Sequence, residues 1–250
     1  MIAVLSPAKT LDYETRRDDM PAATEPRFAT EASHLAAAAA KLSKARLAEL
    51  MHISDALADL NADRYRRFEE LPKRAAIQAF DGDVYDGLGA KTLDRDAILF
   101  AQDHLRIFSG MYGMLRPLDG MRPYRLEMGT KWAPRRGKIT DWWQNRVADL
   151  LMEDLETSGS RAVLNLASVE YWSVVEGRLP VDLRIVDVGF RAADGRFITF
   201  HAKVARGVMS RWMIEHRVTD IDDMRGFDSD GYSFDAAGSE PNRWLFKRNV

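Results

Sequence analysis

Four arginines stand in one stretch of the sequence, between His104 and Gly129, which contains few acids. They are Arg106, Arg116, Arg122 and Arg125. Within the same stretch, Gly110 and Gly113 indicate a tight bend, and the apolar residues between the cations indicate a segment packed against the body of the protein. A rigid turn that carries cations is suited to gripping phosphate groups.

A second group of cations falls on a predicted helix over His201–Arg217. At about 100° per residue, Lys203, Arg206, Ser210 and Arg217 share an arc of roughly 60°. Val204, Ala205, Val208, Met209 and Trp212 lie opposite and are expected to pack inwards. Together with Lys9, the two groups give the candidate phosphate ligands Lys9, Arg106, Arg116, Arg122, Arg125, Lys203, Arg206, Arg211 and Arg217. The alternative explanation is an ordinary solvated helix face.

The distribution of charge favours phosphate binding over a solvated helix face. The net charge is only -2, but eight Lys or Arg face three Asp or Glu between Ala101 and Thr140, and four face one between His201 and Arg217. These windows carry +5 and +3, which leaves -10 on the rest of the chain. Such segregation produces a local positive field on a globally acidic protein, so we expect a basic cleft.

Helices and strands mix along the chain without a strict alternation, which predicts an α+β fold in a single domain over residues 1–250, with a mixed central sheet surrounded by helices. Lys9 leaves the first strand, either towards a central cleft or on a surface turn. The helices are predicted over Glu31–Leu42, Lys44–Met51, Ser54–Glu70, Lys73–Phe80, Gly137–Glu156 and His201–Arg217. Strands are predicted over Ile2–Leu5, Ala162–Leu166, Leu183–Phe190, Arg196–His201 and Trp244–Lys247, with a β-hairpin at Ala192–Gly195.

Composition excludes several classes of function. There is no cysteine, which excludes disulfides, thiolate metal sites and a thiol nucleophile. No apolar run is long enough for a bilayer and no signal peptide is recognisable, so we expect a cytoplasmic protein without a membrane partner. Glu31 and His34 form one Glu-x-x-His motif, whereas a di-iron bundle needs two such motifs. We therefore expect neither a metal nor another cofactor.

Several long motifs occur in a characteristic order: LSPAKTLDY, DGDVYDGL, HLRIFSGMYGMLRPLDGMRPYRLEMG, LNLASVEY, AKVARGVMSR and GFDSDGYSF. With these motifs the whole chain resembles the YaaA family of peroxide-stress proteins. The resemblance implies a bacterial protein that limits damage from hydrogen peroxide and lowers free intracellular iron. It also implies binding of double-stranded DNA, through a positively charged cleft and a helix-hairpin-helix element.

The family motifs contain several of the candidate cations, namely Lys9, Arg116, Arg125, Lys203, Arg206 and Arg211. For the helix-hairpin-helix we favour the glycine pair Gly110 and Gly113. The alternative is the turn from Asp81-Gly82-Asp83 through Gly87-Leu88-Gly89. Its aspartates would repel phosphate, whereas the first turn has one residue more than the usual Gly-hydrophobic-Gly.

Two functions remain open. The first is a protective protein without catalytic activity that grips DNA phosphates with little sequence readout and has no predicted protein partner. The second is an enzyme acting on a phosphorylated or nucleotide-like small molecule, with Asp12, Glu127 or Glu170 as acid–base group. A carboxylate among cations in a deep pocket would distinguish the second from the first. A third possibility, iron binding, has weak support in the sequence.

Overall fold

A computed structural model describes residues 1–15, 17, 19–135 and 137–248 of the chain. Its helices are α1 (Ala29–Ala39), α2 (Lys44–Met51), α3 (Asp55–Arg66), α4 (Ala76–Ala79), α5 (Asp83–Leu88), α6 (Arg95–His104), α7 (Ile139–Thr157), α8 (Val169–Trp172) and α9 (Thr199–Glu215). Short 3-10 turns are η1 (Phe68–Glu70), η2 (Ala90–Thr92), η3 (Asp222–Gly226) and η4 (Ser229–Gly231). None of the helices in the described part combines the length and the apolar character that a bilayer crossing requires.

The described strands build one large sheet and two small pairs. The large sheet has the order β10 (Tyr232–Phe234), β11 (Arg243–Arg248), β9 (Arg184–Arg191), β8 (Ala162–Asn165), β1 (Ile2–Leu5), β5 (Leu105–Ser109) and β6 (Gly113–Leu115). The pairs join β2 (Thr10–Leu11) to β4 (Phe80–Asp81), and β3 (Arg74–Ala75) to β7 (Gly120–Met121). The strands from β5 across to β11 are parallel, and only the edge strands β6 and β10 are antiparallel, so the prediction of an α+β fold with a mixed sheet is confirmed.

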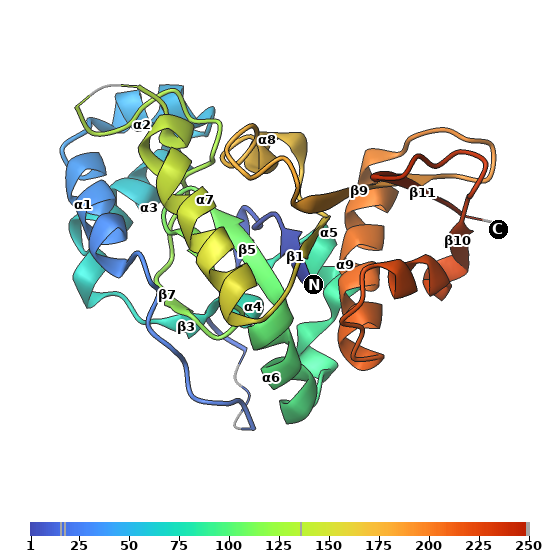
Figure 1. Cartoon of the computed structure of the whole chain (residues 1–250). Helices are drawn as coiled ribbons and strands as arrows, with labels where there is room; N and C mark the ends of the chain where they lie inside the picture. The colour runs from blue at the N-terminus through green and yellow to red at the C-terminus, as the bar shows by residue number, and fades with distance from the viewer. Residues whose placement is uncertain (16, 18, 136, 249–250) are drawn as a thin grey trace.

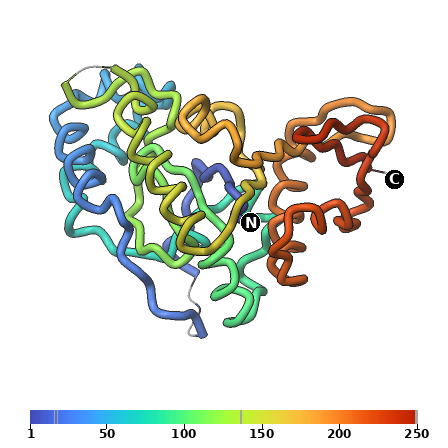
Figure 2. The backbone as a smooth tube through the Cα atoms, in the orientation of Figure 1, coloured from blue at the N-terminus to red at the C-terminus, as the bar shows by residue number. Residues whose placement is uncertain are grey.

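Strand β1 lies at the centre of the sheet and is buried along its whole length. A continuous apolar run is what a parallel strand needs when helices cover both faces of its sheet. Helix α6 contacts β1, β5 and α9, helix α9 also contacts β9, and helices α7 and α8 contact β6 and β5 respectively. Figure 1 shows α1 to α3 gathered beyond α7, and Figure 2 shows the chain after β9 (orange to red) on the opposite side of the molecule.

The order of the strands reverses at β1. The chain passes from β1 to β5 on one side, and after β6 it returns through α7 to β8 on the other side of β1. In open α/β sheets this is a topological switch point, where the loops that leave two neighbouring strands diverge and open a crevice. The crevice lies at the carboxyl ends of the strands, so the fold places a candidate site beyond Leu5 and Asn165.

Three local predictions were wrong. The strand predicted over Arg196–His201 does not form: the turn that contains Gly195 leads into α9, and β9 pairs with β8 and β11 instead. The helix predicted over Lys73–Phe80 is two short strands with one helical turn between them. On α3, the apolar spacing predicts that Leu57, Leu60 and Tyr65 face inwards. Tyr65 does, but Leu57 and Leu60 are exposed, and Ala58, Asn61 and Ala62 are buried instead.

Candidate functional site

A pocket of about 450 Å³ opens at the switch point, beyond the carboxyl ends of β1 and β8. We call it the β1–β8 pocket. Its charged lining comes from loops and helices far apart in the sequence: Lys9, Asp81, Asp83, Glu127, Glu170, Lys203 and Arg206. The volume is in the range of small-molecule sites, and the position is where ligands bind in open α/β sheets.

The turn after β1 is fixed to the neighbouring elements by hydrogen bonds. The hydroxyl oxygen of Ser6 accepts a bond of 2.8 Å from the amide of Ser168, and the hydroxyl of Tyr85 donates to the carbonyl of Ser6 at 3.1 Å. Lys9 follows this turn, with 64% of its side chain exposed, and its Nζ lies 3.1 Å from Oε1 of Glu127. The turn therefore delivers Lys9 to the edge of the pocket, paired with a carboxylate.

Two glycines let α5 and α9 cross with their backbones in contact. A Cβ on Gly207 would lie 1.8 Å from the carbonyl oxygen of Val84, and one on Gly87 would lie 2.2 Å from that of Val204. Only glycine permits so close an approach of two helices. The crossing brings Lys203 of α9 to 3.1 Å from Asp83 at the start of α5.

Arg206 differs from the other cations of the pocket. Its side chain is partly buried and its Nε is buried without a hydrogen-bond partner. No carboxylate among the described residues lies within ion-pair distance of its guanidinium, although Lys9 and Lys203 each have one. Burial lowers the pKa of Arg206, which means that the protein gives this charge less stabilisation than water does. Such a cation is a ready partner for an anion.

Carboxylates and a phenol complete the pocket. Glu127 contacts Lys9 and, at 3.4 Å, Arg125, while Oε1 of Glu170 accepts a bond of 2.9 Å from the amide of Gly129. Burial raises the pKa of Tyr171 well above its usual range, so its hydroxyl stays protonated, and it forms a hydrogen bond with the backbone of Met128. The structure thus places two of the three predicted acid–base candidates, Glu127 and Glu170, among cations.

Asp12, the third candidate, lies elsewhere. It pairs with Lys91 at 3.0 Å and lies 3.9 Å from Arg74, and it does not line the β1–β8 pocket. Burial acts to raise its pKa, but hydrogen bonds from Thr15, Glu14 and Lys91 outweigh burial and hold the pKa well below its usual range. Asp12 is therefore an ionised structural carboxylate in this arrangement.

The arginines of the His104–Gly129 segment are engaged within the protein. Arg106 is 4% exposed and bonds to Asp154 of α7 and to the carbonyls of Gln102, Asp103 and Leu105. Its Nε and Nη1 are thus engaged within the protein, and the cation faces the core and not solvent.

The other three arginines of this segment are more exposed than Arg106, and each is paired with a carboxylate. Arg116 contacts the buried Asp119 at 3.0 Å, and Arg122 lies 3.1 Å from Glu69 with its guanidinium over the ring of Phe68. Arg125 contacts Glu127 at 3.4 Å. Of the four arginines, only Arg125 touches a residue of the β1–β8 pocket.

Arg211 and Arg217 also have structural partners. Arg211 donates to the carbonyl of Gly89 at 2.9 Å and to the hydroxyl of Thr92 at 2.8 Å, which holds the end of α5 against α9. Arg217 follows α9 with a left-handed backbone, and its guanidinium lies 5.2 Å from the ring centre of Phe100. Of the predicted cationic face, Lys203 and Arg206 are therefore the members that reach the pocket, and Ser210 is fully buried.

Gly110 and Gly113 flank the turn of a β-hairpin between β5 and β6, and not a hairpin between helices. A Cβ on Gly110 would lie 2.1 Å from the carbonyl oxygen of Leu126, and Gly113 has a φ of 66° against the ring of Trp143. This corrects the favoured placement of the helix-hairpin-helix, because the stretch is buried sheet. In the alternative stretch, Gly87 and Leu88 are the last residues of α5, and only Gly89 lies between α5 and η2, which α6 follows.

Sequence reasoning missed the pocket residues that follow strands, namely Ser6, Ser168 and Tyr171. A signal was present in the two serines, because Ser6 directly follows β1 and Ser168 comes three residues after β8, and polar residues that follow buried strands mark the carboxyl edge of a parallel sheet. Asp81 and Asp83 were considered only as obstacles to phosphate. Their proximity to Lys203 depends on the crossing of α5 and α9, which no local pattern indicates.

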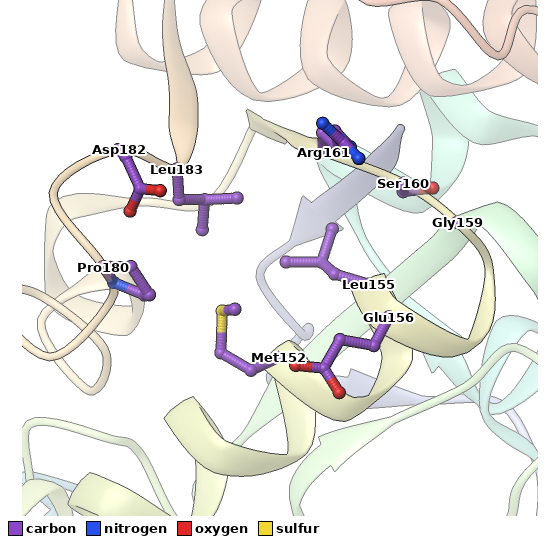
Figure 3. Close-up of a pocket in the computed structure, with 9 residues that line it drawn as sticks. All are labelled: Met152, Leu155, Glu156, Gly159, Ser160, Arg161, Pro180, Asp182 and Leu183. Atoms are coloured by element: carbon purple, nitrogen blue, oxygen red, sulfur yellow. The ribbon is translucent and has the colours of Figure 1, made fainter.

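A second pocket, of about 520 Å³, adjoins the first across Arg206 and is lined by Asn165, Trp172, Asp187, Arg206, Arg243 and Trp244, among others. We call it the β8–β9 pocket. A third cavity lies at the opposite end of the strands, before β8 and β9. Figure 3 shows Met152 and Leu155 of α7 facing Pro180 and Leu183 across that cavity. The charged groups converge at the carboxyl end, so we place the site there.

Comparison with known proteins identifies close relatives. A family described as "Peroxide stress protein YaaA" matches residues 1–238. A "UPF0246 protein" of Rhizorhabdus wittichii is 54% identical over 98% of this chain and 98% of its own length. Proteins of the same description from Ralstonia pickettii and Polynucleobacter necessarius are 47% and 46% identical, covering 100% and 99% of this chain and 100% and 98% of their own lengths.

Proposed function

Because this chain belongs to the family of the peroxide stress protein YaaA, we propose that it serves the peroxide response by binding a small phosphorylated molecule in the β1–β8 pocket and acting on it. The observation that carries this proposal is the unpaired guanidinium of Arg206 in a pocket that also holds Lys9 and Lys203. Arginine pairs with phosphate through parallel hydrogen bonds, and the two lysines add charge without fixed geometry.

Two carboxylates support an action on the ligand and not binding alone. Glu127 and Glu170 line the same pocket as the three cations, which is the arrangement expected for acid–base chemistry beside a phosphate. The absence of cysteine excludes thiol peroxidase chemistry, so protection against peroxide has to pass through another reaction or through binding.

The first test is isothermal titration of the protein with inorganic pyrophosphate. Arg206→Gln is expected to weaken binding by about 1.5–3 kcal/mol, the range for hydrogen bonds to charged groups, which is roughly ten- to a hundredfold. Arg161→Gln, an equal change of charge at the opposite end of β8, is the control and should bind as the unaltered chain does. Equal affinities for all three proteins would exclude the pocket as the phosphate site.

The second test follows the reaction itself. Phosphorus NMR of a panel of nucleotides with the protein should reveal a converted phosphate signal, and Glu127→Gln should abolish the conversion while retaining binding. Unchanged spectra across the panel, with binding intact, would reduce the proposal to a binding function.

A second candidate function is binding of double-stranded DNA, and the glycine turn at Gly89, which joins α5 to η2 ahead of α6, favours it. The first amides of a helical turn have no partner within that turn, so those of η2 can face a phosphate. Lys91, which is 53% exposed and pairs with Asp12 at 3.0 Å, stands beside them. Binding of this kind would rely on backbone phosphates and would weaken steeply with salt. The effects on free iron that the family resemblance implies would then be indirect.

A gel-shift titration with DNA duplexes at several salt concentrations distinguishes DNA binding from binding of a small molecule. Lys91→Glu should weaken every duplex alike and reduce the salt dependence, whereas Arg161→Glu should do neither. Arg211 is unsuitable for this test because it holds the backbone carbonyls of Leu88 and Gly89 at the end of α5. Duplex affinity unaffected by Lys91→Glu would exclude the glycine turn as the contact.

A further inference from the structure

The β1–β8 and β8–β9 pockets are two chambers of one site. Arg206 lines both of them, and so does α8, which contributes Glu170 and Tyr171 to the first and Val169 and Trp172 to the second. A ligand held by Arg206 therefore has space on both sides. Each chamber has the volume of a small-molecule site on its own, so the pair fits a molecule with two distinct halves.

The second chamber offers an aromatic ring and a hydrogen-bond acceptor. Trp172 is only partly buried and lies on the wall of the chamber. Asp187 is exposed there, and its Oδ1 accepts a bond of 2.6 Å from the amide of Asn165. Its second oxygen has no hydrogen bond within the described residues, which leaves an acceptor for hydroxyl groups. A ring to stack against and a carboxylate for hydroxyls are the features that recognise a nucleoside.

We propose that the site takes a free nucleotide, with its phosphate on Arg206, its ribose hydroxyls on Asp187 and its base stacked on Trp172. This inference rests on the proposed phosphate site and adds the nucleoside half to it. The second chamber is lined by three acids, Asp187, Glu176 and Glu240, and by three arginines, Arg191, Arg206 and Arg243, so it has no excess of positive charge for the successive phosphates of a nucleic-acid strand. A single nucleotide places its charge at Arg206 alone.

The test compares pyrophosphate with the four ribonucleoside diphosphates by isothermal titration of the whole chain. The best nucleoside diphosphate should bind at least about tenfold more tightly than pyrophosphate, because stacking and the ribose contacts add to the phosphate contact. Trp172→Leu should remove about tenfold of the nucleotide affinity and leave pyrophosphate unchanged. Trp172→Phe keeps an aromatic face and should retain most of the nucleotide affinity.

Asp187→Asn is the second variant, because Trp172 also packs near Phe108 and its loss could disturb the fold. It should weaken ribonucleoside diphosphates more than their 2′-deoxy forms. Nucleotides that bind no better than pyrophosphate would overturn the nucleoside chamber while the phosphate site stands. Equal losses for pyrophosphate and nucleotide in Trp172→Leu would overturn it as well. No binding of either probe to the unaltered chain would overturn both proposals.

Discussion

Replacing Gly207 with alanine is expected to force α5 and α9 apart, because the crossing leaves no room for a methyl group. A Cβ at this position would lie 1.8 Å from the carbonyl oxygen of Val84 and 2.6 Å from the amide nitrogen of Leu88, whereas ordinary contact begins near 3.4 Å. Both neighbours are backbone atoms, so rotation of a side chain cannot relieve the overlap. The helices themselves have to separate.

The expected loss of stability is about 2 kcal/mol. Overpacking of a close contact costs about 1–3 kcal/mol, and a backbone neighbour puts this case at the upper end. The higher helix propensity of alanine relative to glycine offsets up to about 1 kcal/mol of this cost. For a chain of this length, about 2 kcal/mol corresponds to a melting temperature lower by about 4–8 °C. Since Lys203 and Arg206 stand on α9, pyrophosphate affinity should fall as well.

Thermal unfolding followed by far-ultraviolet circular dichroism measures the first effect, and titration with pyrophosphate measures the second. Gly226→Ala is the matched control, because a Cβ there would meet its nearest neighbour, the ring of Trp212, at an ordinary 3.7 Å. If Gly207→Ala had the same melting temperature and the same pyrophosphate affinity as the unaltered chain, the close crossing of α5 and α9 would not be what positions the cations.

Other predictions concern a buried ion pair and the contact between α9 and the end of α5. Asp154→Asn should lower the free energy of unfolding by about 3–5 kcal/mol, because it leaves the buried Arg106 and its neighbour Arg27 without their carboxylate. Urea unfolding measures this loss, and a loss below about 1 kcal/mol would contradict the prediction. Burial acts to raise the pKa of Asp154, but the hydrogen bonds and charges of the two arginines outweigh burial and lower the pKa. The ionised Asp154 therefore adds to the free energy of unfolding above about pH 3.9, the pKa of an unfolded Asp, and this addition is lost as the pH falls through the lower pKa of the folded state. The decline of stability in acid should therefore be shallower in Asp154→Asn, and parallel curves would count against the linkage. Arg211→Leu should cost about 1–3 kcal/mol in thermal unfolding through the lost bonds to Leu88 and Gly89, and an unchanged melting temperature would show that this cap is dispensable.

Elements with strong local signals were predictable from the sequence. The buried run Ile2–Leu5 and the helix Lys44–Met51 have the predicted bounds, and the serines before α2 and α3 accept hydrogen bonds from the first turns as capping requires. The inner face of α3 was not predictable from hydrophobicity alone. Small residues such as Ala58 and Ala62 permit close packing against α1 and α2, while Leu57 and Leu60 remain at the surface.

The site was predictable only in part, because a sequence shows a cation without its partner. Lys9 and Lys203 reach the pocket as expected of strand-end and helix-face residues. Arg106 looks no different from Arg206 in the sequence, yet Asp154 lies 48 residues away and neutralises it in the core. Counting arginines along the chain therefore overstates the positive charge available to a ligand, and only the pairing in three dimensions identifies Arg206 as free.

The unpaired Arg206 has a consequence for the lifetime of the protein. A partly buried charge without a partner makes the empty chain less stable, so Arg206→Leu is expected to raise the melting temperature while abolishing ligand binding. Bound ligand supplies the missing counter-charge and shifts the folding equilibrium towards the native state. Because cellular proteases degrade the unfolded fraction, the abundance of this protein should rise and fall with the concentration of its ligand.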